Sequence, residues 1–171
     1  MQLRLQAILV LLVLASACAQ TPRATWTSEP TSARIENDFF IARLTPNCHP
    51  TIGCRSFSLS IINKTEKNIE LNWNKTLYIS GGQTTGGFMF EGVVYKDRNN
   101  QKPPDIVFAR GNFLKIIHPN NLVSFASGRY GGWEHSEMPP GENGAYLSVS
   151  VDGKEISERL VMQLALKPSG A

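Results

Sequence analysis

The sequence predicts an all-β protein built as an antiparallel β-sandwich of immunoglobulin-like type. Between residues 33 and 168, short runs alternate apolar with polar side chains, which is the period of a half-buried strand. Polar, Gly-rich and Pro-rich segments interrupt these runs at nearly even spacing, and no convincing amphipathic helix lies between them. Roughly eight short strands in a chain of this length are typical of a sandwich.

The length and composition indicate one folded domain. The chain has 171 residues, of which 42% are hydrophobic and 18% charged. Lys and Arg number 17 against 14 Asp and Glu, so the net charge is only +3. These values exclude a disordered chain, a coiled coil and a nucleic-acid-binding protein with a strong basic stripe. We therefore expect no nucleic-acid partner.

The clearest alternation comes early in the domain. Residues 57–61 read FSLSI and residues 69–73 read IELNW, so each run places three apolar side chains on one face of a strand. The segment 63–68 between them is polar and turn-like, so we expect the two strands to pair as a hairpin. Trp73 is a large side chain of the kind around which a sandwich core is built.

The rest of the domain follows the same pattern. We expect further strands at residues 77–79, 88–95, 106–108, 113–117, 146–151 and 156–166. Loops are expected between them at residues 81–87, 97–104 and 127–143. Residues 160–166 also fit a helical period, which leaves an α+β fold open.

Residues 1–17 have the order of a secretory signal peptide. Arg4 precedes an apolar run over residues 7–14, and the small residues Ala15, Ser16 and Ala17 follow. The apolar run is too short for a transmembrane helix, which needs about 20 residues. We therefore expect an exported protein without a transmembrane helix.

The end of this segment resembles the lipobox of bacterial lipoproteins. Residues 14–18 read LASAC, although that class usually has Leu three positions before the Cys, where this chain has Ala15. The resemblance implies cleavage before Cys18, diacylation of its thiol and acylation of the new amino group. Ala19 after the Cys resembles the sorting pattern for the outer membrane. The resemblance therefore implies an outer-membrane lipoprotein facing the periplasm.

A flexible tether and the folded domain are expected to follow the signal peptide. Residues 18–32 are rich in Thr, Ser and Pro, so we expect an acylated Cys18 followed by a flexible tether and then a sandwich over residues 33–168. Ordinary cleavage after Ala17 or Ala19 is the alternative, and it would release a secreted protein without an anchor.

Three cysteines occur, at positions 18, 48 and 54. An odd count in an exported protein implies a spare thiol, and lipidation of Cys18 would leave Cys48 and Cys54 as a pair. The intervening HPTIG can turn back on itself, so we expect a disulfide in an oxidising compartment. The spacing is not that of a CxxC redox motif, and His49 alone gives too few ligands for zinc.

The sequence contains no recognisable catalytic motif. The Gly-rich segment 81–87 has no following Lys-Ser or Lys-Thr, and neither GxGxxG nor GxSxG occurs. His135 and Glu137 lie two residues apart, but nothing in the spacing brings His49 or His118 to them. We therefore expect a protein that is not an enzyme and that holds neither a cofactor nor a metal ion.

The candidate binding surface lies in the connection over residues 127–143. Its residues are Arg129, Tyr130, Trp133 and Glu137. The first hypothesis is a membrane-anchored lipoprotein that binds a protein partner of the periplasm through an edge strand or through the loops 81–87 and 127–143. The alternative is a glycan-binding or small-ligand-binding protein that uses residues 129–142. Glutamates near an aromatic side chain would suit a sugar, with hydrolysis as an extension.

Overall fold

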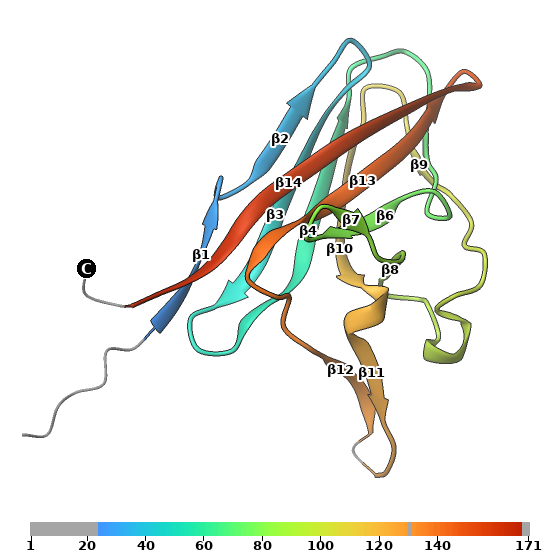
Figure 1. Cartoon of the computed structure of the whole chain (residues 1–171). Helices are drawn as coiled ribbons and strands as arrows, with labels where there is room; N and C mark the ends of the chain where they lie inside the picture. Colours follow the sequence, from blue (N-terminus) through green and yellow to red (C-terminus); the bar gives the residue numbers. More distant parts are fainter. Residues whose placement is uncertain (1–23, 130, 169–171) are drawn as a thin grey trace, which may run out of the picture.

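The computed structural model describes residues 24–129 and 131–168, which form an antiparallel β-sandwich (Figure 1). Strands make up most of this part of the chain, and the only helical turns described are two 3₁₀ turns, Tyr95–Asp97 and Asn120–Leu122. The all-β prediction is thus confirmed. Within the same residues, no helix has the length and apolar character needed to cross a membrane.

The larger sheet has seven strands in the order β1-β14-β13-β5-β9, with β6 beside β13 and β7 beside β6. Its members are β1 (Ala24–Glu29), β5 (Ile69–Leu71), β6 (Leu77–Ser80), β7 (Gln83–Thr84), β9 (Asp105–Val107), β13 (Gly141–Val151) and β14 (Lys154–Pro168).

The smaller sheet has five strands in the order β2-β3-β4-β10-β8. They are β2 (Ala33–Glu36), β3 (Phe40–His49), β4 (Gly53–Asn63), β8 (Phe88–Met89) and β10 (Asn112–Pro119). A separate hairpin, β11 (Val123–Ala126) and β12 (Gly132–His135), extends beyond one end of the sandwich (Figure 1).

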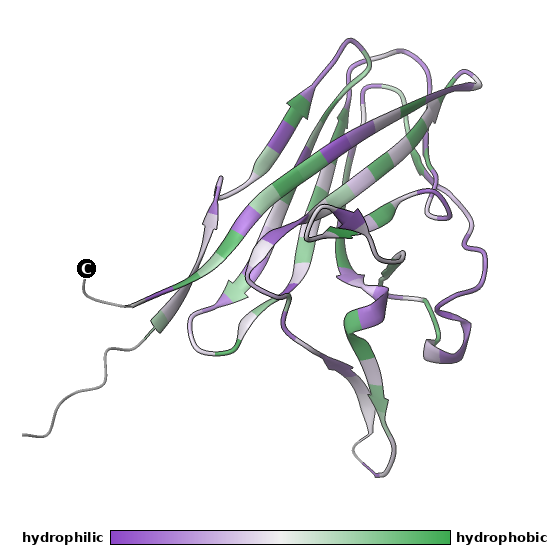
Figure 2. Ribbon diagram, in the orientation of Figure 1, coloured by the Kyte–Doolittle hydropathy of each residue, from purple (hydrophilic) through white to green (hydrophobic). Residues whose placement is uncertain are grey.

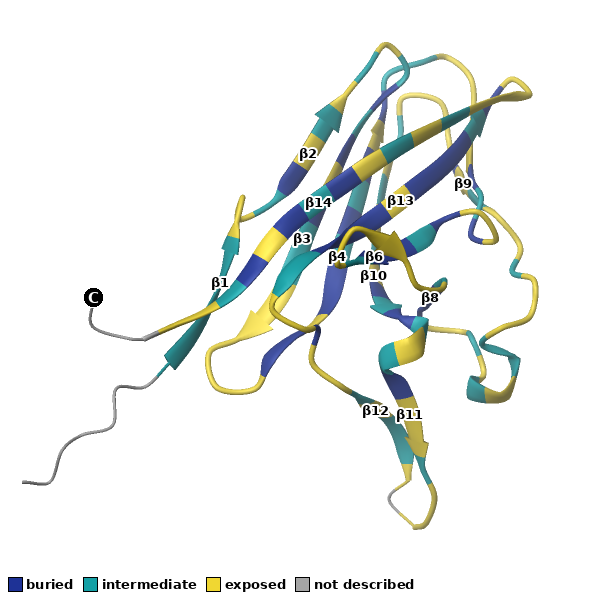
Figure 3. Ribbon diagram, viewed as in Figure 1, coloured by how far each residue is buried: buried dark blue, intermediate teal, exposed yellow. Residues whose placement is uncertain are grey.

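The core fills the space between the two sheets, because alternate residues of each strand turn inward. Apolar and polar segments follow one another along β14, and buried residues alternate there with more exposed ones, whereas β13 is buried over most of its length (Figures 2 and 3). Leu160, Met162 and Leu164 are all buried on one face of β14. That strand is paired with β13 and β1, so the helical alternative for residues 160–166 is wrong.

The expected hairpin between residues 57–61 and 69–73 is also wrong. β4 pairs with β3 and β10 in the smaller sheet, whereas β5 pairs with β13 and β9 in the larger one. The polar segment between them crosses from one sheet to the other. Asn63 holds this crossing, because its buried amide donates to the carbonyl groups of Lys67, Val107 and Phe108. The apolar faces of both strands are buried, as predicted, but in opposite sheets.

The tether expected over residues 18–32 is wrong for residues 24–29, which form β1. This strand pairs with β14 from Ala24 opposite Pro168 to Glu29 opposite Gln163. Thr25 and Thr27 are β-branched and suit a strand, and Trp26 packs against the core. The signal peptide at residues 1–17 and the proposed lipidation site Cys18 lie outside the described residues.

Two loop predictions and one strand prediction need smaller corrections. Residues 81–87 include β7, which pairs with β6. The strand expected over residues 88–95 is limited to Phe88 and Met89, after which the backbone turns. The connection 127–143 contains β12, because its Gly-rich part is the turn of a hairpin with β11.

Candidate binding surface

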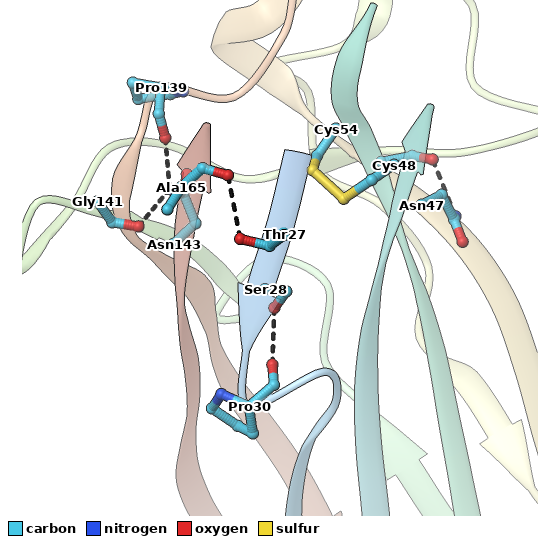
Figure 4. Close-up of a disulfide and its surroundings, with 11 residues drawn as sticks. Thr27, Ser28, Pro30, Asn47, Cys48, Cys54, Pro139, Gly141, Asn143 and Ala165 are labelled. Carbon is cyan, nitrogen blue, oxygen red and sulfur yellow. Dashed lines mark hydrogen bonds between the residues drawn. A yellow bond between two sulfur atoms is a disulfide. The ribbon is translucent and has the colours of Figure 1, made fainter. Parts of the chain in front are cut away.

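The predicted disulfide is present, and it closes the turn between β3 and β4. Cys48 and Cys54 are joined with their Cα atoms 3.8 Å apart. Figure 4 shows the bridge beside β1. Gly53 precedes Cys54 with a φ of +79°, a conformation that favours glycine. A Cβ atom at Gly53 would lie 2.5 Å from Glu137 Oε2 and 3.3 Å from Trp26 Cε2, so both side chains cover this turn.

β10 differs from the other long strands because it is apolar on both faces. Phe113 and Ile117 face the core, and Ile117 is fully buried. Leu114 and Ile116 face outward, with 72% and 53% of their surface exposed. Such a strand leaves an apolar stripe in solvent, which folding alone does not require.

The edge of β10 is open over most of its length. β10 pairs with β4 from Asn112 to Ile117, whereas β8 pairs with it only at His118 and Pro119. The amide of Asn63 donates to the carbonyl of Gly111, which makes residues 63 and 111 a hydrogen-bonded pair in the β4–β10 ladder. Hydrogen-bonded pairs alternate with non-bonded pairs along the ladder. The N–H and C=O groups of Asn112, Leu114 and Ile116 therefore point away from β4.

The pairing of β8 supports this assignment. The amide of Asn120 donates to the carbonyl of Gly87, so even-numbered residues at the end of β10 direct their backbone groups toward β8. β8 ends at Met89, and residues 90–93 form a turn. No backbone partner for Asn112, Leu114 or Ile116 lies on that side within the described residues.

A groove of about 520 Å³ runs along this open edge. It is lined by Leu114, Lys115, Ile116 and His118 of β10 and by Glu91 and Gly92, which follow β8.

The charge of Lys115 is neutralised locally. Its ammonium group is hydrogen-bonded to Asp105, which also accepts a 2.8 Å hydrogen bond from Trp73 Nε1. The same ammonium group lies 4.3 Å from the centre of the Phe90 ring and 5.5 Å from that of Trp73. A cation held in this way is already stabilised by aromatic faces, so Lys115 adds little net charge to the groove.

The β11–β12 hairpin continues the apolar surface. Val123 lies opposite His135 and Phe125 opposite Trp133, so these four side chains share one face. The His135 ring stacks on His118 at 4.1 Å, and the Phe125 ring lies 5.8 Å from that of Tyr95. Phe125 is 53% exposed and Trp133 is partly buried. We call Leu114, Ile116, His118, Phe125 and Trp133 the β10–hairpin surface.

The stacked histidines favour the neutral imidazole. Burial lowers the pKa of His118 to about 4, helped by the nearby His135, and a backbone hydrogen bond at Arg55 partly opposes this. Burial also lowers the pKa of His135, and the charge of Arg55 acts in the same direction. The Nδ1 atoms of both rings are buried without a hydrogen-bond partner. Protonation would therefore place positive charges in a site that does not solvate them.

The structure separates the residues that sequence reasoning grouped together. Trp133 belongs to the β10–hairpin surface, and Arg129 is exposed in the hairpin turn. Tyr130 lies outside the described residues. Glu137 lies over Gly53 and Trp26 instead, and Glu142 is bonded to Arg159. Trp133 and Glu137 thus have different neighbours.

Sequence reasoning did not single out Leu114, Ile116 and Phe125. The available signal was the run FLKII at residues 113–117, which is apolar on both faces of the predicted strand. Such a strand is either covered on both sides or left with an exposed apolar face.

Within the described residues, no group of three or more His, Cys, Asp or Glu side chains is arranged to hold a metal ion. The sequence matches no protein-family model, and a search of curated proteins finds no match either. The functional interpretation therefore rests on the geometry of the chain itself.

Proposed function

We propose that the protein is a non-enzymatic, membrane-anchored envelope lipoprotein whose sandwich binds a protein partner through the β10–hairpin surface. The observation that carries this proposal is the outward exposure of Leu114, Ile116 and Phe125 around an open strand edge. Monomeric proteins seldom expose large contiguous apolar patches, and such patches commonly mark protein interfaces. Aromatic side chains such as Phe125 and Trp133 are frequent anchors in interfaces.

The lipid anchor would be at Cys18. β1 begins at Ala24, six residues further on, and six extended residues reach at most about 20 Å. Trp26 contacts the disulfide turn, and the amide of Met138, which follows the hairpin, donates to the carbonyl of Cys54. β1, the disulfide turn and the base of the hairpin are therefore close together. An anchored chain would bind its partner near the membrane.

No observation favours the alternative of a glycan or small-ligand site in residues 129–142, because Trp133 and Glu137 have different neighbours. The protein-binding proposal is the one that the exposed surface supports.

Site-specific photo-crosslinking in intact envelopes tests the proposal. A photo-reactive phenylalanine analogue is placed at position 114 or 125, and at position 146 as the control. Tyr146 is 38% exposed on β13 in the other sheet. We expect a discrete crosslinked protein from positions 114 and 125 and none from position 146. The absence of any adduct from both test positions would contradict the proposed function.

A further inference from the structure

The backbone of β10 specifies how a partner would bind. Leu114 and Ile116 present unpaired N–H and C=O groups along the edge, and their side chains stand on the outer face beside it. Unpaired edge groups are a template for another strand. Natural proteins usually blunt such an edge with charges, with Pro or by keeping the strand short. Residues 112–117 have none of these features on their outward-facing positions.

We propose that the partner contributes one extended segment, which adds to the smaller sheet as a strand along residues 112–117 of β10. This inference rests on the proposed function and defines its binding mode. The added strand would follow the line of β8, which already pairs with the last two residues of β10. Main-chain hydrogen bonds to Asn112, Leu114 and Ile116 would supply affinity, and alternate side chains would supply specificity.

The lining of the groove favours a partner segment over a second copy of this chain. Glu91 and Gly92 line the groove together with β10, so a strand added to β10 would also meet these two residues. A second copy that paired through its own β10 would bring a Lys115 that is already bound to Asp105, and it would offer no free cation to Glu91. A segment of another protein can carry that cation.

The charges of the groove define the chemistry of the segment. Glu91 is exposed and makes no ion pair with any residue described here. Lys115 is already paired with Asp105. The uncompensated charge in the groove is thus negative, and it favours a Lys or Arg in the partner. The segment should carry apolar residues at alternate positions beside Leu114 and Ile116 and one basic residue opposite Glu91.

Two variants separate the contribution of the β10 backbone to partner binding from the contribution of the Leu114 side chain. Leu114→Pro removes an outward N–H and leaves the β4 ladder intact, because proline is tolerated where the N–H faces solvent. Leu114→Thr also removes the apolar side chain but keeps the N–H, so it is the matched control. Hydrogen exchange of the Lys115 amide, which belongs to the β4 ladder, verifies that β10 stays paired in both variants.

Random twelve-residue peptides displayed on phage and selected on the full-length protein serve as the probe. We expect the selected peptides to alternate apolar residues and to contain Lys or Arg. Their binding should fall about tenfold in Leu114→Pro relative to Leu114→Thr, since one main-chain hydrogen bond is lost. It should also fall in Glu91→Lys relative to Glu91→Gln. Bound peptide should protect the amides of Leu114 and Ile116 from exchange.

The outcomes are distinct. If no peptide is selected, or if selected peptides bind Leu114→Pro and Leu114→Thr equally, strand addition is wrong. Self-association of the full chain that Leu114→Pro abolishes would show a second copy as the occupant, and it would also overturn the proposal. Crosslinking from position 114 that is unchanged in Ile116→Pro would keep the proposed function and exclude strand addition. Absence of crosslinking from position 114 both with and without Ile116→Pro would contradict the proposed function itself.

Discussion

β14 and β10 are both long strands with an unpaired stretch of edge, but the two stretches differ in chemistry. β14 pairs with β13 over residues 154–164 and with β1 only over residues 163–168, so one of its edges has no paired strand over residues 154–162. That stretch carries four charged residues, Lys154, Glu155, Glu158 and Arg159. β10 has β4 on one side and is open on the other over most of its length, with the apolar Leu114 and Ile116 outward. Charges along an edge discourage strand addition, which is why we propose β10 rather than β14 as the binding strand.

The other sheet edges strengthen this contrast. β2 closes the smaller sheet with only four residues, and two of them, Arg34 and Glu36, form an ion pair. β9 closes the larger sheet with three residues. Short or charged edges discourage strand addition. The edge of β10 is neither short nor charged.

The largest expected effect is on folding, in β14. Leu160→Ala should lower the free energy of unfolding by about 3 kcal/mol, because Leu160 is 1% exposed in the core and its removal leaves a cavity. Urea denaturation measures the change. Leu114→Ala, at 72% exposure, is the matched control and should change stability by less than about 0.5 kcal/mol. Equal losses in the two variants would contradict the distinction between the strands.

Removal of the disulfide should have the next largest effect. Cys48→Ser together with Cys54→Ser opens a loop with a sequence separation of 6 and should cost about 2 kcal/mol in the chain-entropy account. Urea denaturation again provides the value. Because Leu114 lies opposite Ser60, six residues along β4 from Cys54, crosslinking from position 114 should survive. Its loss would mean that the disulfide turn itself shapes the binding surface.

A charge on the outer face of β10 should affect binding and not folding. Leu114→Asp should reduce crosslinking from position 125 about tenfold, because a carboxylate would lose its water in an apolar interface. Val161→Asp, on the outward face of β14, is the comparison variant and should leave crosslinking unchanged. A similar reduction in both variants would show that net charge, rather than the β10 surface, governs capture.

At neutral pH the smallest expected effect is that of the two histidines, which change stability only as the pH falls. The pKa of His118 is lowered to about 4 from its ordinary value of 6.5, and that of His135 is lowered too, so folding favours the neutral rings. The stability that depends on them is complete above pH 6.5 and is lost as pH falls toward 4. Urea denaturation across this range measures the slope, which should be shallower in His118→Gln. An unchanged slope in that variant would assign the pH dependence to other groups.

The candidate site was only partly visible in the sequence. The Gly-rich connection indicates Trp133, and side-chain alternation predicts the strand at residues 113–117. Nothing local, however, indicates that Leu114 points to solvent while Phe113 faces the core. Both are apolar, and the choice of face depends on which strand lies beside them. Glu137 lies near Trp133 along the chain, but the fold places it on the disulfide turn instead.

By itself the sequence determined most of the strands between residues 57 and 166 and the Cys48–Cys54 pair, because side-chain alternation and loop closure act over a few residues. The tertiary structure alone decided which strands are neighbours. β4 and β5 follow one another in the chain yet lie in opposite sheets. Residues 24–29 form a strand because their backbone pairs with that of β14. The open edge of β10 has the same origin. This edge depends on β4, which pairs with β10 from about fifty residues earlier in the chain, and on the residue at which β8 ends. Main-chain hydrogen bonds between such distant segments leave no pattern in the local sequence.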